Sequence, residues 1–316
     1  MTDDALDTIC KNTNLILLEI KANSSSIITE RGILFLVPGL RNLQSFALEY
    51  ENYSDGRTLN YGDDKKFMYN LGLFILNHRL VSFSIDWPFN YVALLKILCN
   101  RNLKQIKISN SSSINAINEL IHTNPLESII LQDINTRDVN ETMNAIPVGI
   151  KHLELNGVCH FDMLTGLTNF SNLTTLIFKP TTRYASISPY LTTEIKQIAI
   201  CCRKLKIVYL PIHDDETLIE FSKCPLVELE IQDGRGVTDD GLRKLKNLKH
   251  LGLGYSNMTD YRIVDGLQEF IMATPNRISQ EGFRKMNNNL EYLGNINGYS
   301  LEFVLQEIGS MKMLKK

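Results

Sequence analysis

The stretch Val237–Leu253, VTDDGLRKLKNLKHLGL, decides the fold because versions of it recur along the chain. One version opens the sequence as MTDDALDTICKNTNLILLEI, and a looser copy returns near the end as ISQEGFRKMNNNLEYL. Each copy has a polar start, a middle with apolar residues at helical spacing, and a finish with large apolar residues three positions apart. A phrase that recurs in this way is typical of a repeat architecture.

The finish of the unit follows the template L-x-x-L-x-L, with Ile, Phe, Val or Met allowed, and it can be traced through the whole chain. Its copies begin at Leu15, Leu43, Leu80, Leu103, Leu126, Ile150, Leu173, Leu205, Leu226, Leu248, Leu267 and, in a decayed form, Leu290. Between Leu80 and Leu173 successive copies start 23, 23, 24 and 23 residues apart. Positions 4 and 6 of the template point to one face of a short strand and position 5 to the other, because side chains alternate along a strand.

The segments between these strands are typical of helices. DETLIEFSK and DDGLRKLK carry apolar residues at helical spacing, Thr238 and Ser279 are suitable N-caps, and Asp239 and Asp240 suit the positive end of the helix dipole. A unit of one strand and one helix cannot bury its apolar face alone, but stacked copies can. The sequence predicts an α/β class and a single solenoid domain over residues 1–316. This solenoid is curved, with a parallel inner sheet, outer helices, about twelve coils and a C-terminal capping helix at about 300–314.

A doubly wound sheet also alternates strands and helices. It would need a glycine-rich phosphate loop after an early strand, and neither G-x-G-x-x-G nor G-x-x-x-x-G-K occurs in the chain. The regular period therefore favours the solenoid.

Composition excludes several classes of function. The formal net charge is only -2, which argues against nucleic acid as a partner. No apolar run approaches the roughly 18 residues that span a bilayer, and the N-terminus lacks the pattern of a signal peptide. The six cysteines form no paired C-x-x-C motif, and most of them fall where a helix turns into a strand. We therefore expect reduced, buried thiols in a cytoplasmic or nuclear protein, with no membrane contact.

TDDALDTICKNTNLILLEI and VTDDGLRKLKNLKHLGL resemble the cysteine-containing leucine-rich repeats of the F-box/LRR proteins, which are of the ribonuclease-inhibitor-like type. In that family the repeats hold a substrate or partner, and an F-box links them to a ubiquitin ligase through the Skp1-cullin adaptor. No F-box pattern is visible in this chain, and relatives without one act as bare binding modules. The resemblance implies a protein-binding module, either a substrate-recognition or adaptor subunit in ubiquitin ligation or cell-cycle control, or a stand-alone scaffold or inhibitor.

Solenoids bind partners on the concave sheet, where positions 3, 5 and 7 of each coil are displayed. Apolar and aromatic residues at these positions gather in the middle and late coils, and neighbouring glutamates favour a basic partner segment. The predicted partner-binding residues are Ile130, Ile177, Ile207, Tyr209, Glu228, Glu230, His250 and Tyr255. Good sheet propensity explains the same residues equally simply, and the irregular segments at 50–66 and 180–195, with the lone Trp87, are alternative contact sites.

Two short clusters carry chemistry-bearing side chains. Cys159, His160 and Asp162 stand together in GVCHFD, but catalytic partners come from distant segments rather than from neighbours on one turn. His213-Asp214-Asp215 offers metal-type ligands without a second group at a recognisable spacing, so solvated turn residues that start the next helix explain it better. The sequence predicts no catalytic residues, no cofactor and no metal.

Overall fold

A computed structural model describes residues 2–22, 32, 39–50, 64–76, 78–86, 95, 98–99, 102–109, 114–133, 139–158, 163–180, 191–256, 266–272 and 291–294. The chain divides into two compact units, residues 1–150 with 154–160, and residues 151–153 with 161–316. The expected capping helix at about 300–314, Ser279, Trp87 and the Cys159-His160 pair lie outside the described residues, as do 51–63 and 181–190 of the two irregular segments.

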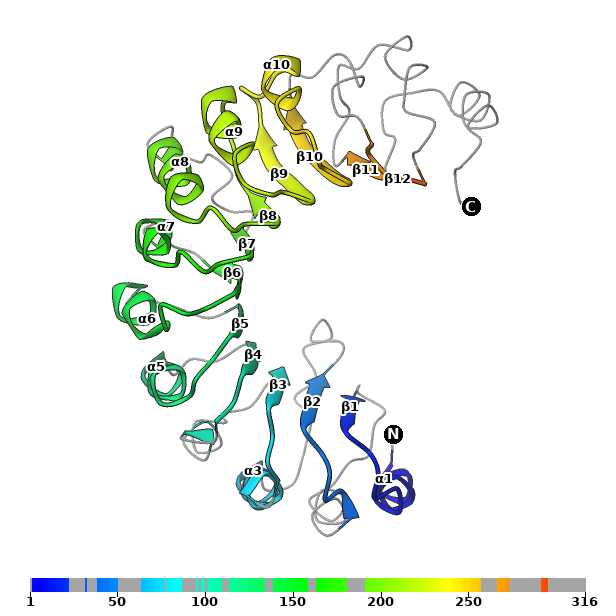
Figure 1. Ribbon diagram of the computed structural model, residues 1–316. Coiled ribbons are helices and arrows are strands. Elements are labelled where there is room, and N and C mark those ends of the chain that lie inside the picture. The colour runs from blue at the N-terminus through cyan, green and yellow to red at the C-terminus, as the bar shows by residue number, and fades with distance from the viewer. Residues whose placement is uncertain are drawn as a thin grey trace. The chain divides into compact units, whose positions relative to one another are not determined.

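The first unit alternates strands with helices along the chain (Figure 1). Its elements are α1 (Asp3–Cys10), β1 (Leu17–Ala22), β2 (Ser45–Tyr50), α3 (Asp64–Leu76), β3 (Ser82–Asp86), β4 (Gln105–Ser109), α5 (Ile114–Thr123), β5 (Ser128–Gln132), α6 (Val139–Ala145) and most of β6 (His152–Val158). Strands β1 to β5 pair in parallel in the order of the chain.

The second unit repeats this plan. Its elements are α7 (Met163–Gly166), the 3-10 turn η2 (Leu167–Asn169), β7 (Thr175–Pro180), α8 (Leu191–Cys201), β8 (Ile207–Leu210), α9 (Asp215–Phe221), β9 (Glu228–Gly234), α10 (Asp239–Leu242), β10 (His250–Ser256), β11 (Glu269–Met272) and β12 (Tyr292–Gly294). Strands β7 to β12 also follow chain order. The pairings between neighbouring strands from β7 to β12 are all parallel.

Every strand begins two residues after the first position of its template copy, so the counted repeat is confirmed down to the decayed copy at Leu290. One backbone device sets this register between neighbouring strands. The carbonyl just before a strand accepts two N–H groups from the next coil, as when the Val227 oxygen accepts from Lys249 at 2.8 Å and from His250 at 3.1 Å. Because the same pair of hydrogen bonds recurs along each unit, neighbouring strands keep the same register.

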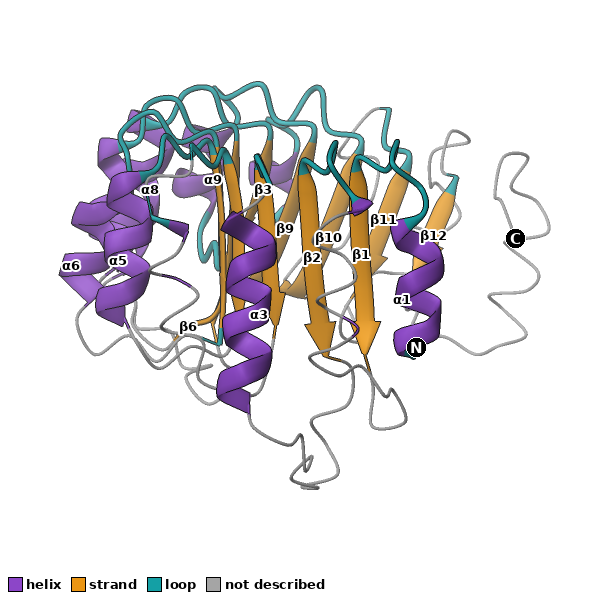
Figure 2. Cartoon of the chain, turned by 90° about the horizontal axis from the view of Figure 1, so that it is seen from below, coloured by secondary structure: helices purple, strands orange, loops and turns teal. Residues whose placement is uncertain are grey.

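In each unit the described helices all lie on one face of the sheet, and none of them lies on the other face (Figure 2). Positions 4 and 6 point toward the helices and are fully buried, as at Leu229 and Ile231 in β9, where both side chains are 0% exposed. The core of the first unit also holds an aromatic cluster, with the ring of Phe46 4.9 Å from that of Phe74 and 6.3 Å from that of Phe83. Apolar burial at these alternate positions is the main stabilising term of such a repeat.

The cysteines within the described residues lie where the sequence analysis expected them, and Cys159 lies outside these residues. Cys10, Cys202 and Cys224 are buried thiols, and Cys201 is a partly buried thiol. The partly buried Cys99 thiol donates to the Leu95 carbonyl at 3.6 Å. The Cys202 thiol donates to the Leu167 carbonyl at 3.4 Å, and the Cys224 thiol lies within 3.8 Å of the Cys202 carbonyl. A small thiol at this corner therefore satisfies carbonyls of the preceding coils.

No helix in the described ranges has both the length and the apolar character needed to cross a membrane.

Candidate functional site

The helix-free face of the second unit displays its side chains in two ordered rows. One row joins Ile207, Glu228, His250 and Glu269, and the next joins Ile177, Tyr209, Glu230, Gly252 and Ile271. Neighbours within a row lie one strand apart, about 4.8 Å. The strict register therefore brings residues up to about 90 positions apart in the chain onto one small surface.

The row that contains glycine has a gap in the middle. Gly252 adds no side chain between Glu230 and Ile271, and the result is a hollow of about 60 Å³ above β9 and β10. The lining residues are Tyr209, Glu228, Leu229, Glu230, His250, Leu251, Gly252, Glu269 and Ile271. A methyl group placed on Gly252 would meet the Glu230 Cγ at 3.0 Å, so any side chain there would begin to fill the hollow.

Tyr209 forms one wall of the hollow and is held by two neighbours. Its hydroxyl donates a hydrogen bond to the Glu228 carboxylate, and the Lys179 Nζ lies 4.6 Å from the centre of its ring. Partial burial, followed by the hydrogen bond and the negative charge of Glu228, raises the pKa of Tyr209 far above its ordinary value. Tyr209 is therefore a protonated donor at physiological pH, in a fixed orientation.

The charges around the hollow do not balance. Three carboxylates, Glu228, Glu230 and Glu269, line it. Lys179 pairs with Glu230 at 3.5 Å, and the His250 Nδ1 lies 2.7 Å from the Glu269 Oε2. One lysine and one imidazole therefore face three carboxylates, and the excess is negative whether or not the imidazole carries a proton.

The helix-free face of the first unit is different because its charges are paired closely. The Lys107 Nζ lies 2.6 Å from the Glu49 Oε1, and Lys21 lies 3.1 Å from Glu19. These contacts join side chains on the same face, and Glu19 and Glu49 each have a lysine partner there. An uncompensated cluster around a hollow is thus a property of the second unit among the two described surfaces.

The structure brings together most of the predicted site residues. Tyr209, Glu228, Glu230 and His250 line the hollow, and Ile207 and Ile177 continue the two rows beside them. Ile130 lies on β5 of the first unit, half-buried, in register with Lys107. In β10 the backbone of Tyr255 is in register with Asp233 of β9, but the Tyr255 side chain is not among the described ones.

Sequence reasoning missed three contributors to the hollow, Gly252, Glu269 and Ile271. All three occupy displayed positions of the template, and Ile271 is 39% exposed. The available signal was a glycine at position 5 between two coils that carry side chains there. A search for exposed apolar residues does not detect such a gap, because the informative residue is the one without a side chain.

The His213-Asp214-Asp215 cluster has a structural role. Asp214 caps α9 by accepting from the Thr217 N–H at 2.6 Å, and Asp215 accepts from the backbone N–H and the hydroxyl of Thr238 at 2.8 and 2.5 Å. Thr238 is itself the expected N-cap of α10. Within the described ranges no three His, Cys, Asp or Glu side chains are grouped so that they could hold a metal ion.

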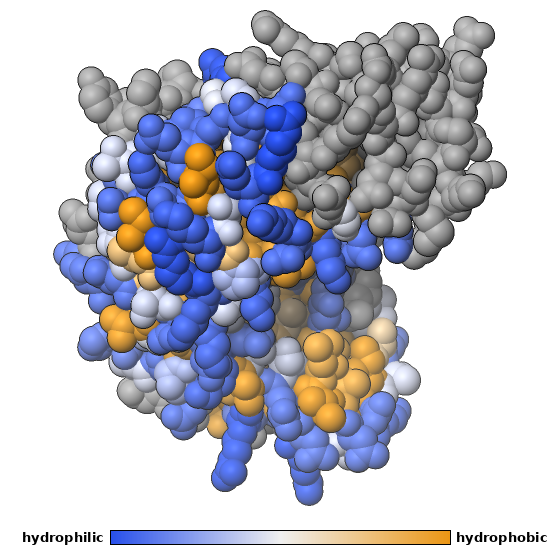
Figure 3. Space-filling model, turned by 45° about the horizontal axis from the view of Figure 1, so that its top comes forward, coloured by the Kyte–Doolittle hydropathy of each residue, from blue (hydrophilic) through white to orange (hydrophobic). Residues whose placement is uncertain are grey.

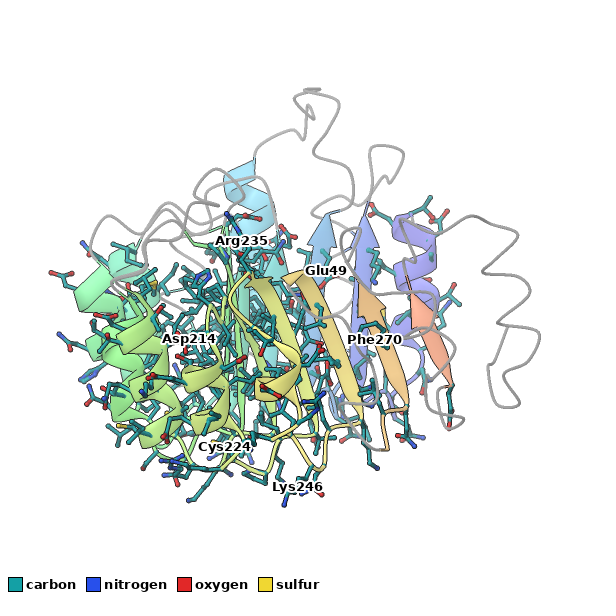
Figure 4. All side chains as sticks on the ribbon, turned by 90° about the horizontal axis from the view of Figure 1, so that it is seen from above. Glu49, Asp214, Cys224, Arg235, Lys246 and Phe270 are labelled. Carbon is teal, nitrogen blue, oxygen red and sulfur yellow. The ribbon has the colours of Figure 1, made fainter. Side chains whose placement is uncertain are left out.

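His213 differs from the expectation of a solvated turn residue. Its side chain is half-buried, and its Nε2 is enclosed without a hydrogen-bond partner. Burial lowers the pKa of His213, partly offset by the negative charge of Asp233. Asp214 immediately precedes α9. In Figure 4, Arg235 lies at one end of the strands, and Cys224 and Lys246 lie toward the other end.

Comparison with known proteins identifies the fold and no closer relationship. No protein-family model and no curated protein sequence matches the chain. Among solved structures, a chain from the complex of Rad7 and Elc1 in yeast matches with a TM-score of 0.62 at 16% identity, over 100% of this chain and 78% of that one. The fold is a leucine-rich-repeat solenoid.

An internalin from Listeria monocytogenes matches this solenoid with a TM-score of 0.50 at 16% identity. The match covers 100% of this chain and 88% of the internalin. At such identities the likeness concerns the backbone and its repeat, and the residues of the face are this chain's own.

Proposed function

We propose that the chain is a protein-binding leucine-rich-repeat module without catalytic activity, and that residues 1–316 act as one repeat domain. The partner contacts the helix-free face of the second unit. The observation that carries this proposal is the row formed by Ile177, Tyr209 and Ile271. Tyr209 in a fixed orientation, the half-buried Ile177 and the exposed Ile271 lie between charged groups, which is the composition of an interface anchor surrounded by a polar rim.

A finer assignment follows the resemblance to the F-box/LRR proteins. We propose that the module is a substrate-recognition or adaptor subunit, working in the cytoplasm or nucleus, in ubiquitin ligation or cell-cycle control. The likeness to a chain solved as part of a two-protein complex supports an adaptor role at the level of the fold. The alternative is a stand-alone scaffold or inhibitor that uses the same face without a ligase.

Affinity purification of the tagged chain, followed by quantitative mass spectrometry, tests both levels. The variant Tyr209→Ala with Glu230→Arg removes the aromatic anchor and inverts one charge of the hollow, so capture of the bound partner should fall at least tenfold. The melting temperature should change little, because Tyr209 is only half-buried and contacts surface side chains, and the exposed Lys179–Glu230 pair is worth less than about 1 kcal/mol. The matched control, Ile219→Ala with Glu216→Arg on the exposed side of α9, should capture the partner normally.

Capture that survives the Tyr209 and Glu230 changes would exclude this face as the contact surface. The same purification separates the finer alternatives. Near-stoichiometric recovery of the Skp1-cullin adaptor supports the ligase assignment. Its absence beside another enriched protein supports the stand-alone module.

A further inference from the structure

The hollow over Gly252 has a shape and lining that select one kind of guest. Its walls are partly apolar, with the ring of Tyr209 on one side and Ile271 on the other. Its rim is anionic, with Glu228, Glu230 and Glu269. A guest that fits both features has an aliphatic stem and a cationic end.

We propose that this hollow receives a single lysine or arginine side chain from the protein partner. The proposal rests on the proposed function and names the partner chemistry that the same face recognises. The stem would lie along Ile271 and the tyrosine ring, and the ammonium or guanidinium group would reach the carboxylates. Lysine and arginine side chains bury their methylene groups on apolar surface in this way while the charged end stays among polar groups.

The carboxylates have unused capacity for such a guest. Glu228 accepts the Tyr209 hydroxyl, which is a neutral donor and leaves the charge of the carboxylate uncompensated. The cation that pairs with Glu230, Lys179, is 44% exposed, so the incoming group can replace it at little cost. A hydrogen bond between charged groups is about twice as strong as one between neutral groups, which favours a cationic guest over a neutral one.

The position of Lys179 indicates where the guest's charge can lie. Its Nζ lies 4.6 Å from the centre of the Tyr209 ring and 3.5 Å from Glu230, so the face already holds one ammonium group between an aromatic ring and a carboxylate. Cations are attracted to the face of an aromatic ring. The other side of the hollow, toward Glu269 and Ile271, presents the same pairing of carboxylate and apolar wall without a lysine among its lining residues.

A large apolar partner surface fits this face less well. Three carboxylates line the hollow, and an apolar surface placed over them would bury their charges without a partner. Figure 3 shows the molecule from another side, on which the described surface is also mostly hydrophilic, with hydrophobic side chains in small groups. Nucleic acid is disfavoured because its phosphates would meet three carboxylates. Charge complementarity therefore selects a basic peptide segment of a protein.

The test uses fluorescein-labelled nonapeptide pools with random uncharged flanks and one fixed central residue. The central residue is arginine, lysine, citrulline or glutamate, and citrulline has the size of arginine without its charge. We expect the full chain to bind the arginine or lysine pool at least tenfold more tightly than the citrulline pool in anisotropy titrations, a difference of about 1.4 kcal/mol. The preference should shrink at about 1 M salt, where the Debye length is about 3 Å.

Two variants locate the preference in the hollow. Gly252→Leu fills it, and Glu230→Gln removes one charge while keeping the shape, so each should reduce the cationic preference severalfold. The matched control, Glu216→Gln on the outer side of α9, should leave the preference unchanged. Melting curves of all three show whether the fold is kept, and Glu230→Gln provides the decisive result if the bulkier Gly252→Leu is unstable.

Equal binding of the arginine, lysine and citrulline pools would overturn the proposal, and so would a cationic preference that survives both hollow variants. The outcome is independent of partner capture. If Tyr209→Ala with Glu230→Arg abolishes capture but no cationic preference exists, the face binds a partner by other chemistry and only this inference is wrong. If capture is unaffected while the preference exists, the proposed function is wrong and the hollow is a separate cation-side-chain site.

Discussion

Asn124 joins two consecutive coils through its side chain, which is 5% exposed. Its amide nitrogen donates to the carbonyls of Leu120 at 2.8 Å and Leu98 at 3.2 Å, and its oxygen accepts from the Leu103 N–H at 3.1 Å. A buried amide that meets three backbone groups compensates polar atoms that would otherwise have no partner. Removing it exposes those groups to the full desolvation penalty.

Asn124→Ala should therefore lower the free energy of unfolding by about 2 to 3 kcal/mol. Urea titration followed by circular dichroism measures this change. Thr8→Ala in α1 is the control, because that hydroxyl is exposed and donates only within its own helix, to the Asp4 carbonyl at 3.0 Å. A loss below about 0.5 kcal/mol for Asn124→Ala would show that water can replace the amide.

His213 gives the stability of the second unit a dependence on pH. An unfolded histidine titrates at about 6.5, and burial lowers the pKa of the folded His213 below that value, with Asp233, Arg235 and Asp214 as the charged groups around it. Below about pH 6.5 the unfolded chain binds a proton at His213, whereas the folded chain binds it only at a lower pH. Stability is therefore fully present above about 6.5 and is lost as the pH falls toward the folded pKa.

His213→Leu should flatten the pH dependence of the free energy of unfolding in the range just below about pH 6.5. Urea titrations at several pH values test this, with His122→Leu as control because His122 is exposed at the end of α5. Parallel pH profiles for the His213 variant and the unaltered chain would contradict the assignment.

At the scale of the element, short helices depend on their first residue. The seven residues of α9 are too few to be stable alone, and Asp214 satisfies one of its free N–H groups. Asp214→Ala should lower the free energy of unfolding by about 1 kcal/mol, whereas Asp214→Asn, which caps nearly as well, should cost much less. Differential scanning calorimetry distinguishes the two variants, and equal losses would show that charge rather than capping is the stabilising factor.

The elements also show what a sequence can predict and where it stops. The start of every strand followed from the template, because the alternation of apolar residues encodes which face is buried. The N-cap Thr238 followed from local chemistry in the same way. The hollow could not be predicted from the sequence, because it depends on residues of four strands in register and on the absence of a side chain at Gly252. The enclosed Nε2 of His213 also depends on packing between coils, which no local pattern records.

At the scale of the whole molecule, the thiols report on unfolding. Burial raises the pKa of Cys202 to about 12 and also raises that of Cys224, so neither forms the reactive thiolate in the folded chain. Iodoacetamide at about pH 8 should label both residues at least a hundredfold more slowly in native buffer than in urea. Mass spectrometry of tryptic peptides measures the rates, and rapid native labelling of Cys202 would show that its coil opens locally.

The register of the second unit has a consequence for the spacing of any sequence motif that this face recognises. Strands are about 4.8 Å apart, whereas an extended peptide advances about 3.4 Å per residue. Side chains of such a segment that face the sheet lie two residues apart, or about 6.8 Å, so successive ones cannot meet equivalent positions on successive strands. The first near match comes at four residues, about 13.6 Å, against three strand spacings, about 14.4 Å. Such a face therefore contacts a few separated side chains of the bound segment, and the residues between them are free to vary.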